Sequence, residues 1–278
     1  MNNKYVIFAI ILIVLTWSLF PILWGMRTSF LNENDLRSKE LNFIPSQVNL
    51  ENYASLLGFN EDGQNLHRDF RSAMINSFIA CGGATILVIL ISSVAGYVFS
   101  RIDFFGSSLI FAMVVATMTL PAYAVMIPLY KIMINIGLLD TYTGIILIYT
   151  SAFIPLGIWL MRSHFNTVPI ELEEAAQVAG ASRFRSFLTI VPLVTPGIIS
   201  VAILTFLNTW SQFVIPLVFA PNNARPLTVL ITEYVGKHSI NYGLMTAAGM
   251  LTIIPPLLVV VFLNRYLISG LTSGAVKG

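Results

Sequence analysis

Residues 5–26 read YVIFAIILIVLTWSLFPILWGM, a run without a single charged side chain. An α-helix needs about 20 mostly apolar residues to cross the hydrocarbon core of a bilayer. The run is longer than the roughly 7–15 residues of a signal-peptide core, and no Ala-x-Ala-like cleavage site follows it. The stretch therefore predicts a retained membrane-spanning helix.

The whole chain has the same character. Of its 278 residues 56% are hydrophobic and 10% are charged, and the mean hydropathy is +0.80. Soluble domains are nearer 45–50% apolar and about a quarter charged, so this composition predicts a protein embedded in membrane lipid. The formal net charge of +2 predicts no nucleic-acid partner, because such a partner calls for a clearly basic surface. Cys81 lies in an apolar run and is interpreted as a small buried hydrophobe.

Six apolar segments are long enough to span a bilayer. Their predicted bounds are 5–26, 73–100, 108–130, 142–161, 195–220 and 244–267. Polar segments connect them, and an even number of spans places both termini on one side. The predicted fold class is an all-α polytopic membrane protein with six transmembrane helices. Lysines and arginines divide almost evenly between the two sides, so the positive-inside rule does not orient the chain.

Small residues and prolines inside the spans predict how the helices pack and bend. Ala80 and Ala84, and then Ser92 and Gly96, are four residues apart, a spacing that lets helix backbones approach closely in lipid. Prolines predict interruptions in the third to sixth spans, which proteins tolerate where neighbours or a water-filled cavity satisfy the freed carbonyls. These prolines are Pro121, Pro128, Pro155, Pro216, Pro255 and Pro256.

The motifs of catalysis are absent from the sequence. It has no Gly-Lys-Ser/Thr phosphate loop, no histidine in a metal-ligand spacing and no recognisable nucleophile triad. We therefore predict no catalytic, cofactor-binding or metal residues, and no enzyme. The predicted spans contain no Asp, Glu or His, whereas proton-driven transporters usually carry ionisable residues in the membrane. Transport through these spans would therefore need an energy source other than a proton gradient, or it would be passive and follow the concentration gradient of the solute.

Charge is concentrated at residues 171–187, ELEEAAQVAGASRFRSF, between the fourth and fifth spans. Asn166 or Thr167 can cap a helix whose first turn contains Pro169, and three glutamates favour its positive end. Gly180 is a natural stop because glycine adopts the left-handed conformation freely. An apolar face is expected from Leu172, Ala175, Ala176 and Ala179, and so short a helix needs a surface to dock on.

A second short helix is predicted to follow. Ser182 can cap it, with Arg183 and Arg185 near its positive end, where cations are disfavoured unless paired. Its expected apolar stripe consists of Phe184, Phe187, Leu188 and Val191. From the residues alone, two interpretations of residues 162–194 remain open: a surface loop whose arginines bind lipid headgroups, or a docking site for a soluble partner.

A polar stripe lies within the fifth predicted span. Thr205, Asn208, Thr209 and Gln212 recur at helical spacing, beside Trp210. Burying such groups is costly unless they find partners. They can hydrogen-bond neighbouring helices, or they can line an aqueous cavity and contact a solute. Both alternatives stay open.

One segment of the chain resembles a known family. Glu174-Ala175-Ala176, three further residues and Gly180, followed by Ile190 and Pro192, resemble the EAA loop of the permease subunits of bacterial ATP-binding-cassette importers. The interval from Gly180 to Pro192 is one residue shorter than the family's G-x9-I-x-L-P pattern. Further segments resemble sugar permeases of the maltose type: FIPSQVNLENYASLL (43–57), FRSAMINSF (70–78), AGYVFSRIDFFG (95–106), WSQF (210–213) and GLTSGAVKG (270–278).

The resemblance implies a division of the chain and a set of partners. Residues 1–72 would form the first transmembrane helix and an extracytoplasmic loop, 73–267 the importer core with the EAA loop at 162–194, and 268–278 a cytoplasmic tail. The family's EAA helix is a cytoplasmic coupling helix that docks on the ATPase subunit. The implied coupling residues are Glu171, Glu173, Glu174, Ala175, Ala176, Gly180, Arg183 and Arg185.

The expected function is import of a sugar, of oligosaccharide or disaccharide size, across the bacterial cytoplasmic membrane, with both termini cytoplasmic. The implied partners are a second, different permease, two cytoplasmic ATPases that bind ATP and Mg²⁺, and an extracytoplasmic sugar-binding protein. The alternatives are a permease for a non-sugar solute and an ATP-independent channel or facilitator. The residues expected along the substrate path are Thr205, Asn208, Thr209, Trp210 and Gln212.

Overall fold

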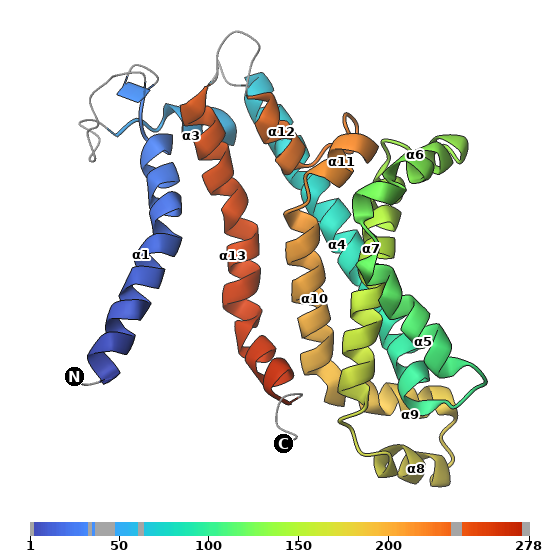
Figure 1. The fold of residues 1–278 in the computed structure, drawn as a ribbon. Helices are drawn as coiled ribbons and strands as arrows, with labels where there is room; N and C mark the ends of the chain where they lie inside the picture. The colour runs from blue at the N-terminus through green and yellow to red at the C-terminus, as the bar shows by residue number, and fades with distance from the viewer. Residues whose placement is uncertain (1–2, 33–34, 37–47, 61–63, 235–240, 274–278) are drawn as a thin grey trace. The chain divides into compact units, whose positions relative to one another are not determined.

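The computed structural model describes residues 3–32, 35–36, 48–60, 64–234 and 241–273, without the side chains of residues 3, 64, 122 and 264–273. The described residues form helices and connecting turns, without strands, as the sequence predicts. The chain divides into two compact units, one made of Met1–Met74 and Leu227–Ile254, the other of Ile75–Pro226 and Pro255–Gly278. Helices α4 (Gln64–Arg101) and α13 (Tyr242–Ser273) contribute residues to both units (Figure 1).

Five helical runs of the described chain are long and apolar enough to cross a membrane. They are Lys4–Ser29, Asn65–Arg101, Tyr142–Phe165, Arg183–Trp210 and Tyr242–Leu263. A bent pair, Ser107–Thr119 and Tyr123–Asn135, makes up to six if it counts as one span. This agrees with the prediction of six spans. The observed helices extend beyond several predicted bounds, because flanking polar residues continue the helices past the apolar runs.

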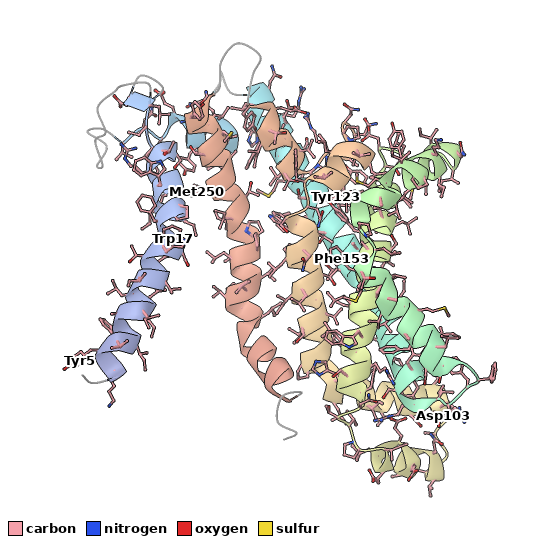
Figure 2. The ribbon with its side chains drawn as sticks, viewed as in Figure 1. Tyr5, Trp17, Asp103, Tyr123, Phe153 and Met250 are labelled. Atoms are coloured by element: carbon pink, nitrogen blue, oxygen red, sulfur yellow. The ribbon has the colours of Figure 1, made fainter. Side chains whose placement is uncertain are left out.

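The first unit contains α1 (Asn3–Ser29), α3 (Glu51–Leu57), α12 (Leu227–Glu233) and the beginnings of α4 and α13. The Ser29 hydroxyl lies 2.6 Å from the Tyr53 hydroxyl, which joins α1 to α3. None of the residues in the most apolar window of α1 is buried, and Trp17 is 83% exposed (Figure 2). A helix that is apolar all round and uncovered suits a lipid environment.

The third predicted span is a broken helix. α5 (Ser107–Ala116) continues into a 3₁₀ turn (Thr117–Thr119), and a second 3₁₀ turn (Ala122–Val125) leads into α6 (Met126–Asn135) at 91°. The break falls at Leu120, which is extended because the ring of Pro121 disfavours the helical conformation of the preceding residue. Pro128 lies in the first turn of α6, where its missing N–H costs nothing.

Of the other predicted interruptions, the one at Pro216 is confirmed, and those at Pro155 and at Pro255 and Pro256 are wrong. Pro155 lies inside an unbroken α7 (Tyr142–Phe165), and Pro255 and Pro256 lie inside an unbroken α13. The predicted span 195–220 is wrong in extent, because α10 (Thr195–Trp210) ends early and α11 (Val214–Phe219) begins anew. Pro216 explains this end, since its ring would clash with the Gln212 carbonyl four residues earlier in a continuous helix.

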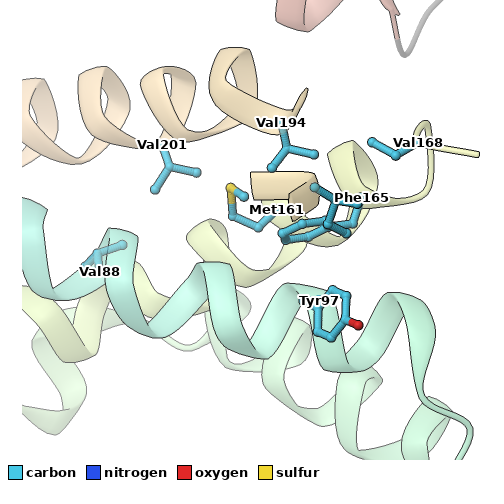
Figure 3. Packing of buried hydrophobic residues seen from close by; sticks show 8 residues of the cluster. Val88, Tyr97, Met161, Phe165, Val168, Val194 and Val201 are labelled. Carbon is cyan, nitrogen blue, oxygen red and sulfur yellow. The ribbon is translucent and has the colours of Figure 1, made fainter. Parts of the chain in front are cut away.

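The core of the second unit lies among α4, α7 and α10 (Figure 3). Two close approaches of α4 to α7 depend on small residues. A Cβ atom at Gly96 would lie 2.6 Å from the Met161 Cβ, and one at Gly157 would lie 2.9 Å from the Ser92 Cβ. The predicted role of Ser92 and Gly96 in helix packing is confirmed. The buried cluster comprises Val88, Tyr97, Met161, Phe165, Val168, Ile190, Val194 and Val201.

A carboxylate clamp holds the end of the second unit that lies opposite α8 (Glu171–Val178) and α9 (Arg183–Ile190) (Figure 1). Asp140, with a φ of +57°, accepts hydrogen bonds from the backbone N–H groups of Asn222 at 3.1 Å and Asn223 at 3.0 Å. Its own N–H donates to the Phe219 carbonyl at 2.9 Å. The clamp ties the α6–α7 turn to the segment after α11.

Candidate functional site

The charged segment folds into a helical hairpin made of α8 and α9. α8 begins at Glu171, later than predicted, and no side chain caps it. Asn166 instead ends α7 and accepts a hydrogen bond from the Ser100 hydroxyl at 2.7 Å, while the Thr167 hydroxyl donates to the His164 carbonyl at 2.8 Å. Both predicted caps were wrong because α7 continues to Phe165 and uses these residues at its own end.

Gly180 ends α8 as predicted. Its φ is +89°, its N–H donates to the Gln177 carbonyl, and the Ala181 N–H donates to the Ala176 carbonyl, both at 2.9 Å. This pair of bonds is the Schellman arrangement, which satisfies the last carbonyls of a helix. A Cβ atom at Gly180 would have no atom within 4 Å, so this turn faces open space.

α9 begins at the predicted cap, because the Ser182 hydroxyl accepts the Arg185 N–H at 3.3 Å. The predicted stripe is only partly correct. Phe187 packs inward, with its ring centroid 5.0 Å from that of Tyr97, whereas Phe184 is 67% and Leu188 50% exposed. Ser186 and Ile190 supply the buried face instead, and a 3₁₀ turn (Val191–Val194, containing Pro192) follows.

The outer face of the hairpin is exposed and mixed in character. Arg183 and Arg185 are exposed and form no ion pair within the described part of the chain. Apolar side chains stand among the charges, and Val178 is 90% exposed. We call this face the α8–α9 surface. It comprises Glu171, Leu172, Glu174, Ala175, Val178, Ala179, Gly180, Arg183, Phe184, Arg185 and Leu188.

Two predicted coupling residues lie away from this surface. Ala176 is half-buried, and Glu173 is 3% exposed. Arg101 Nε donates to Glu173 Oε1 at 2.5 Å, and the Tyr97 hydroxyl donates to Oε2 at 3.0 Å. Sequence reasoning missed Arg101 and Tyr97 as partners of this glutamate. The only signal for Arg101 was its place as the cation that ends the second apolar run.

The predicted polar stripe of the fifth span does not face one space. Thr205 and Thr209 are buried, and the Thr209 hydroxyl donates to the Thr205 carbonyl at 2.8 Å. Trp210 packs between the rings of Phe206 and Phe78, with centroids 5.3 and 5.1 Å away. Asn208 is exposed and donates to its own helix, at the Leu204 carbonyl. Because α10 ends at Trp210, Gln212 lies beyond the helix and no longer follows the helical spacing of the other three residues.

Gln212 lines a cavity of about 460 Å³ within the second unit. The break at Pro121, the middle of α7 and the α10–α11 break enclose it, and Tyr123 and Phe153 belong to its wall (Figure 2). Its volume lies within the roughly 300–1,000 Å³ of small-molecule sites. The polar side chains of the lining are those of Thr117, Tyr123, Ser151 and Gln212.

Two further findings concern a possible metal site and Asn76. No group of three or more His, Cys, Asp or Glu side chains that could hold a metal ion occurs in that part of the chain. Asn76, a further polar residue near the membrane, has structural partners: it donates to the Arg225 carbonyl at 2.9 Å and accepts from the Tyr142 hydroxyl at 2.7 Å.

Comparisons with known proteins show which proteins this chain is similar to. The chain is 33% identical over 96% of its length, and 91% of the relative, to the sulfoquinovosyl glycerol transport system permease protein SmoH of Agrobacterium fabrum. It is 33% identical over 94% of its length, and 92% of the relative, to the trehalose/maltose transport system permease protein MalG of Thermococcus litoralis. The trehalose transport system permease protein SugB of Mycobacterium tuberculosis is 32% identical, with 96% of this chain and 95% of the relative covered.

A solved structure shares the fold. In a bacterial ABC transporter involved in the import of the acidic polysaccharide alginate, one chain superposes with a TM-score of 0.79 at 20% identity, covering 96% of this chain and 99% of that one. Residues 88–273 match the family model described as binding-protein-dependent transport system inner membrane component. The chain therefore belongs to the family of binding-protein-dependent transport system inner membrane components, and it is a transport subunit rather than an enzyme.

Proposed function

We propose that this chain is the permease subunit of an ATP-driven sugar importer, which moves a sugar of disaccharide or oligosaccharide size across the bacterial inner membrane. The proposal is supported by its relatives, whose names specify trehalose, maltose and a sulfoquinovosyl glycerol, and which match more than 90% of the chain. The importer would contain a second, different permease, two cytoplasmic ATPases that bind ATP and Mg²⁺, and an extracytoplasmic sugar-binding protein.

The α8–α9 surface is the proposed contact with an ATPase subunit, and its exposed apolar side chains carry this proposal. Val178, Phe184 and Leu188 are exposed beside charged residues, on a hairpin whose second helix, α9, begins the apolar run Arg183–Trp210. Exposed apolar side chains grouped within a polar rim are typical of protein contact sites. The exposed Ala175 and Ala179 would let a partner approach the α8 backbone closely.

Orientation follows from this role. An ATPase works in the cytoplasm, so the α8–α9 surface, both termini and the segment 268–278 would be cytoplasmic, and residues 27–72 would lie outside. Closure of the ATPases around ATP would displace the hairpin and move the helices between outward- and inward-open states. The linkage requires ATP to bind the assembly with different free energies in these two states.

The cavity beside Gln212 is the proposed place where this chain contacts the sugar. Amide and hydroxyl groups from Gln212, Ser151 and Thr117 can hydrogen-bond sugar hydroxyls, and Tyr123 offers an aromatic face. Of the five residues expected along the substrate path, Gln212 has this position. Thr205, Thr209 and Trp210 are buried in the protein and would hold α10 in place beside the cavity without contacting the sugar. Asn208 would lie outside the cavity.

A matched pair of phenylalanines tests the ATPase contact. Phe184 is 67% exposed on the α8–α9 surface, and Phe59 is 80% exposed after α3. Because aromatic side chains at the centre of an interface often contribute more than about 2 kcal/mol to binding, Phe184→Asp should reduce co-purification of the ATPases at least about tenfold. Phe59→Asp should leave it unchanged. Undiminished ATPase recovery with Phe184→Asp would contradict the docking role.

Uptake of radiolabelled trehalose and maltose into proteoliposomes tests the reaction itself. The complete assembly should take up sugar only with MgATP supplied on the ATPase side. Uptake at the same rate after removal of the ATPases would support the facilitator alternative. ATP-dependent uptake of an amino acid or phosphate, with no response to either sugar, would support the non-sugar alternative.

A further inference from the structure

Three glutamates open α8, but the helix turns them to different sides. At 3.6 residues per turn, Glu173 lies about 100° around the axis from Glu174 and about 160° from Glu171. Glu171 and Glu174 are exposed, while Glu173 is 3% exposed. Two carboxylates therefore remain on the α8–α9 surface, and the third points back into the protein.

The buried carboxylate meets the end of α4. Arg101 Nε donates to its Oε1 at 2.5 Å, and the exposed fractions of the two side chains are 9% for Arg101 and 4% for Glu173. The Tyr97 hydroxyl, one turn earlier in α4, donates to Oε2 at 3.0 Å. Arg101 Nη2 also donates to the Val168 carbonyl at 2.6 Å, which secures the chain just before α8.

This contact attaches α8 to α4, and α8 also packs against α9. Glu173 is the one fully buried side chain of its eight residues, so no buried apolar residue of α8 holds it to the core. α9, by contrast, buries Ile190 and packs Phe187 against Tyr97. Where α8 meets α4, the contact is therefore a charged, directional one and not apolar packing.

We propose that Glu173 is a positioning residue that locks α8 to the end of α4, so that displacement of the α8–α9 surface moves α4 with it. The proposal rests on the proposed function, in which an ATPase displaces that surface. Glu173 then acts within the chain, through Arg101 and Tyr97, while Glu171 and Glu174 act at the outer face. A buried charge pair suits this task, since loss of either partner leaves an uncompensated buried charge.

A distance measurement within the assembled complex tests whether Glu173 holds α8 to the end of α4. Spin labels on Gln177→Cys, which is exposed on α8 and is not part of the α8–α9 surface, and on Val94→Cys, which is 55% exposed on α4, report the separation of the two helices. The native Cys81 is buried, so labelling is confined to the introduced cysteines. The wild-type pair should give one narrow distance distribution that is the same without nucleotide and with MgATP and vanadate.

Glu173→Gln should broaden that distribution at least about twofold and make it change with nucleotide, because α8 then moves without α4. Arg101→Gln should do the same, and the double variant should add little, since both single changes break one contact. Arg101→Lys keeps the charge and should give a distance distribution nearly as narrow as that of the wild type. Tyr97→Phe keeps both the ion pair and the ring, and should give an intermediate width.

Glu171→Gln and Glu174→Gln are the matched controls, because they remove the same charge from exposed positions of the same turn. Both should retain the wild-type distribution. An equally narrow, nucleotide-independent distribution in Glu173→Gln would overturn the proposal, and so would equal broadening in the two controls. Failure of the ATPases to co-purify with the wild-type chain would instead refute the proposed function, while the width measured without ATPases would still report on the lock.

Discussion

Gly180 is a single residue on which the shape of the α8–α9 surface depends. Its φ of +89° is costly for a β-branched residue, while its Cβ position is open, so strain would come from the backbone alone. Gly180→Val should therefore distort the hairpin and reduce both ATPase co-purification and sugar uptake several-fold. Gly180→Asn is the control, since asparagine tolerates the left-handed conformation. Full assembly and uptake in Gly180→Val would argue against a docking role for this turn.

Asp140 combines an unusual backbone conformation with several hydrogen bonds. Asp140→Asn keeps an acceptor oxygen and tolerates a φ of +57°, whereas Asp140→Ala loses the acceptors and strains the backbone. Asn222 and Asn223 are exposed, so water can replace the lost acceptor, and the net loss is about 0.5–1.5 kcal/mol per hydrogen bond. With the backbone strain added, the alanine variant should melt several degrees below the wild type and the asparagine variant much closer to it. Thermal unfolding of the purified complex measures this. An alanine variant that melts at the wild-type temperature would assign the clamp no stabilising role.

At the scale of elements, the packing of α4 on α7 depends on the absence of side chains. A Cβ atom at Gly96 would overlap Met161 and approach the backbone nitrogen of Arg162 to 2.8 Å, whereas one at Gly82 in the same helix meets nothing within 4 Å. Overpacking typically costs 1–3 kcal/mol, so Gly96→Ala should lower the melting temperature by several degrees and Gly82→Ala should not. Alanine favours a helix more than glycine does, so helix propensity alone would not lower either melting temperature. A similar loss in both variants would therefore mean that the α4–α7 contact at Gly96 does not determine the result.

The elements also show what sequence reasoning can reach. Apolar length predicts the spans, and Ser182 and Gly180 mark the ends of the hairpin helices, because these signals act within a few residues of the chain. The bend at Pro121 and the end of α10 before Pro216 follow local rules as well, although their exact places depend on the surrounding packing. Which prolines interrupt a helix was not predictable, since α7 accommodates Pro155 without a break.

Sequence reasoning could not predict the burial of Glu173, for a different reason. Its partners Tyr97 and Arg101 are 76 and 72 residues away in the sequence, and only the docking of α8 on α4 brings them together. In the sequence all three glutamates equally suit the positive end of a helix. The exposure of Gln212 to the cavity likewise depends on where α10 ends, which changes the direction of every later side chain.

At the scale of the whole molecule, the proposed function requires a particular orientation in the membrane. The α8–α9 surface and the segment after α11 lie at opposite ends of the second unit, so they should face opposite sides of the bilayer (Figure 1). Evenly divided cations do not orient the chain. Only the proposed ATPase contact would orient it, since an ATPase has access to the cytoplasmic side alone. The orientation is therefore a direct consequence of the coupling role.

Cysteine labelling measures this orientation. A membrane-impermeant maleimide should modify Val178→Cys in inside-out vesicles from cells that lack the ATPases, but not in intact cells or spheroplasts, because its exposed side chain would lie in the cytoplasm. Asn222→Cys, which keeps the backbone N–H bound to Asp140, should react with the opposite preference. The unsubstituted chain is the control, since its buried Cys81 should stay unmodified on both sides. Modification of Val178→Cys from outside intact spheroplasts would place the α8–α9 surface beyond the reach of any ATPase, and the proposed coupling could not operate.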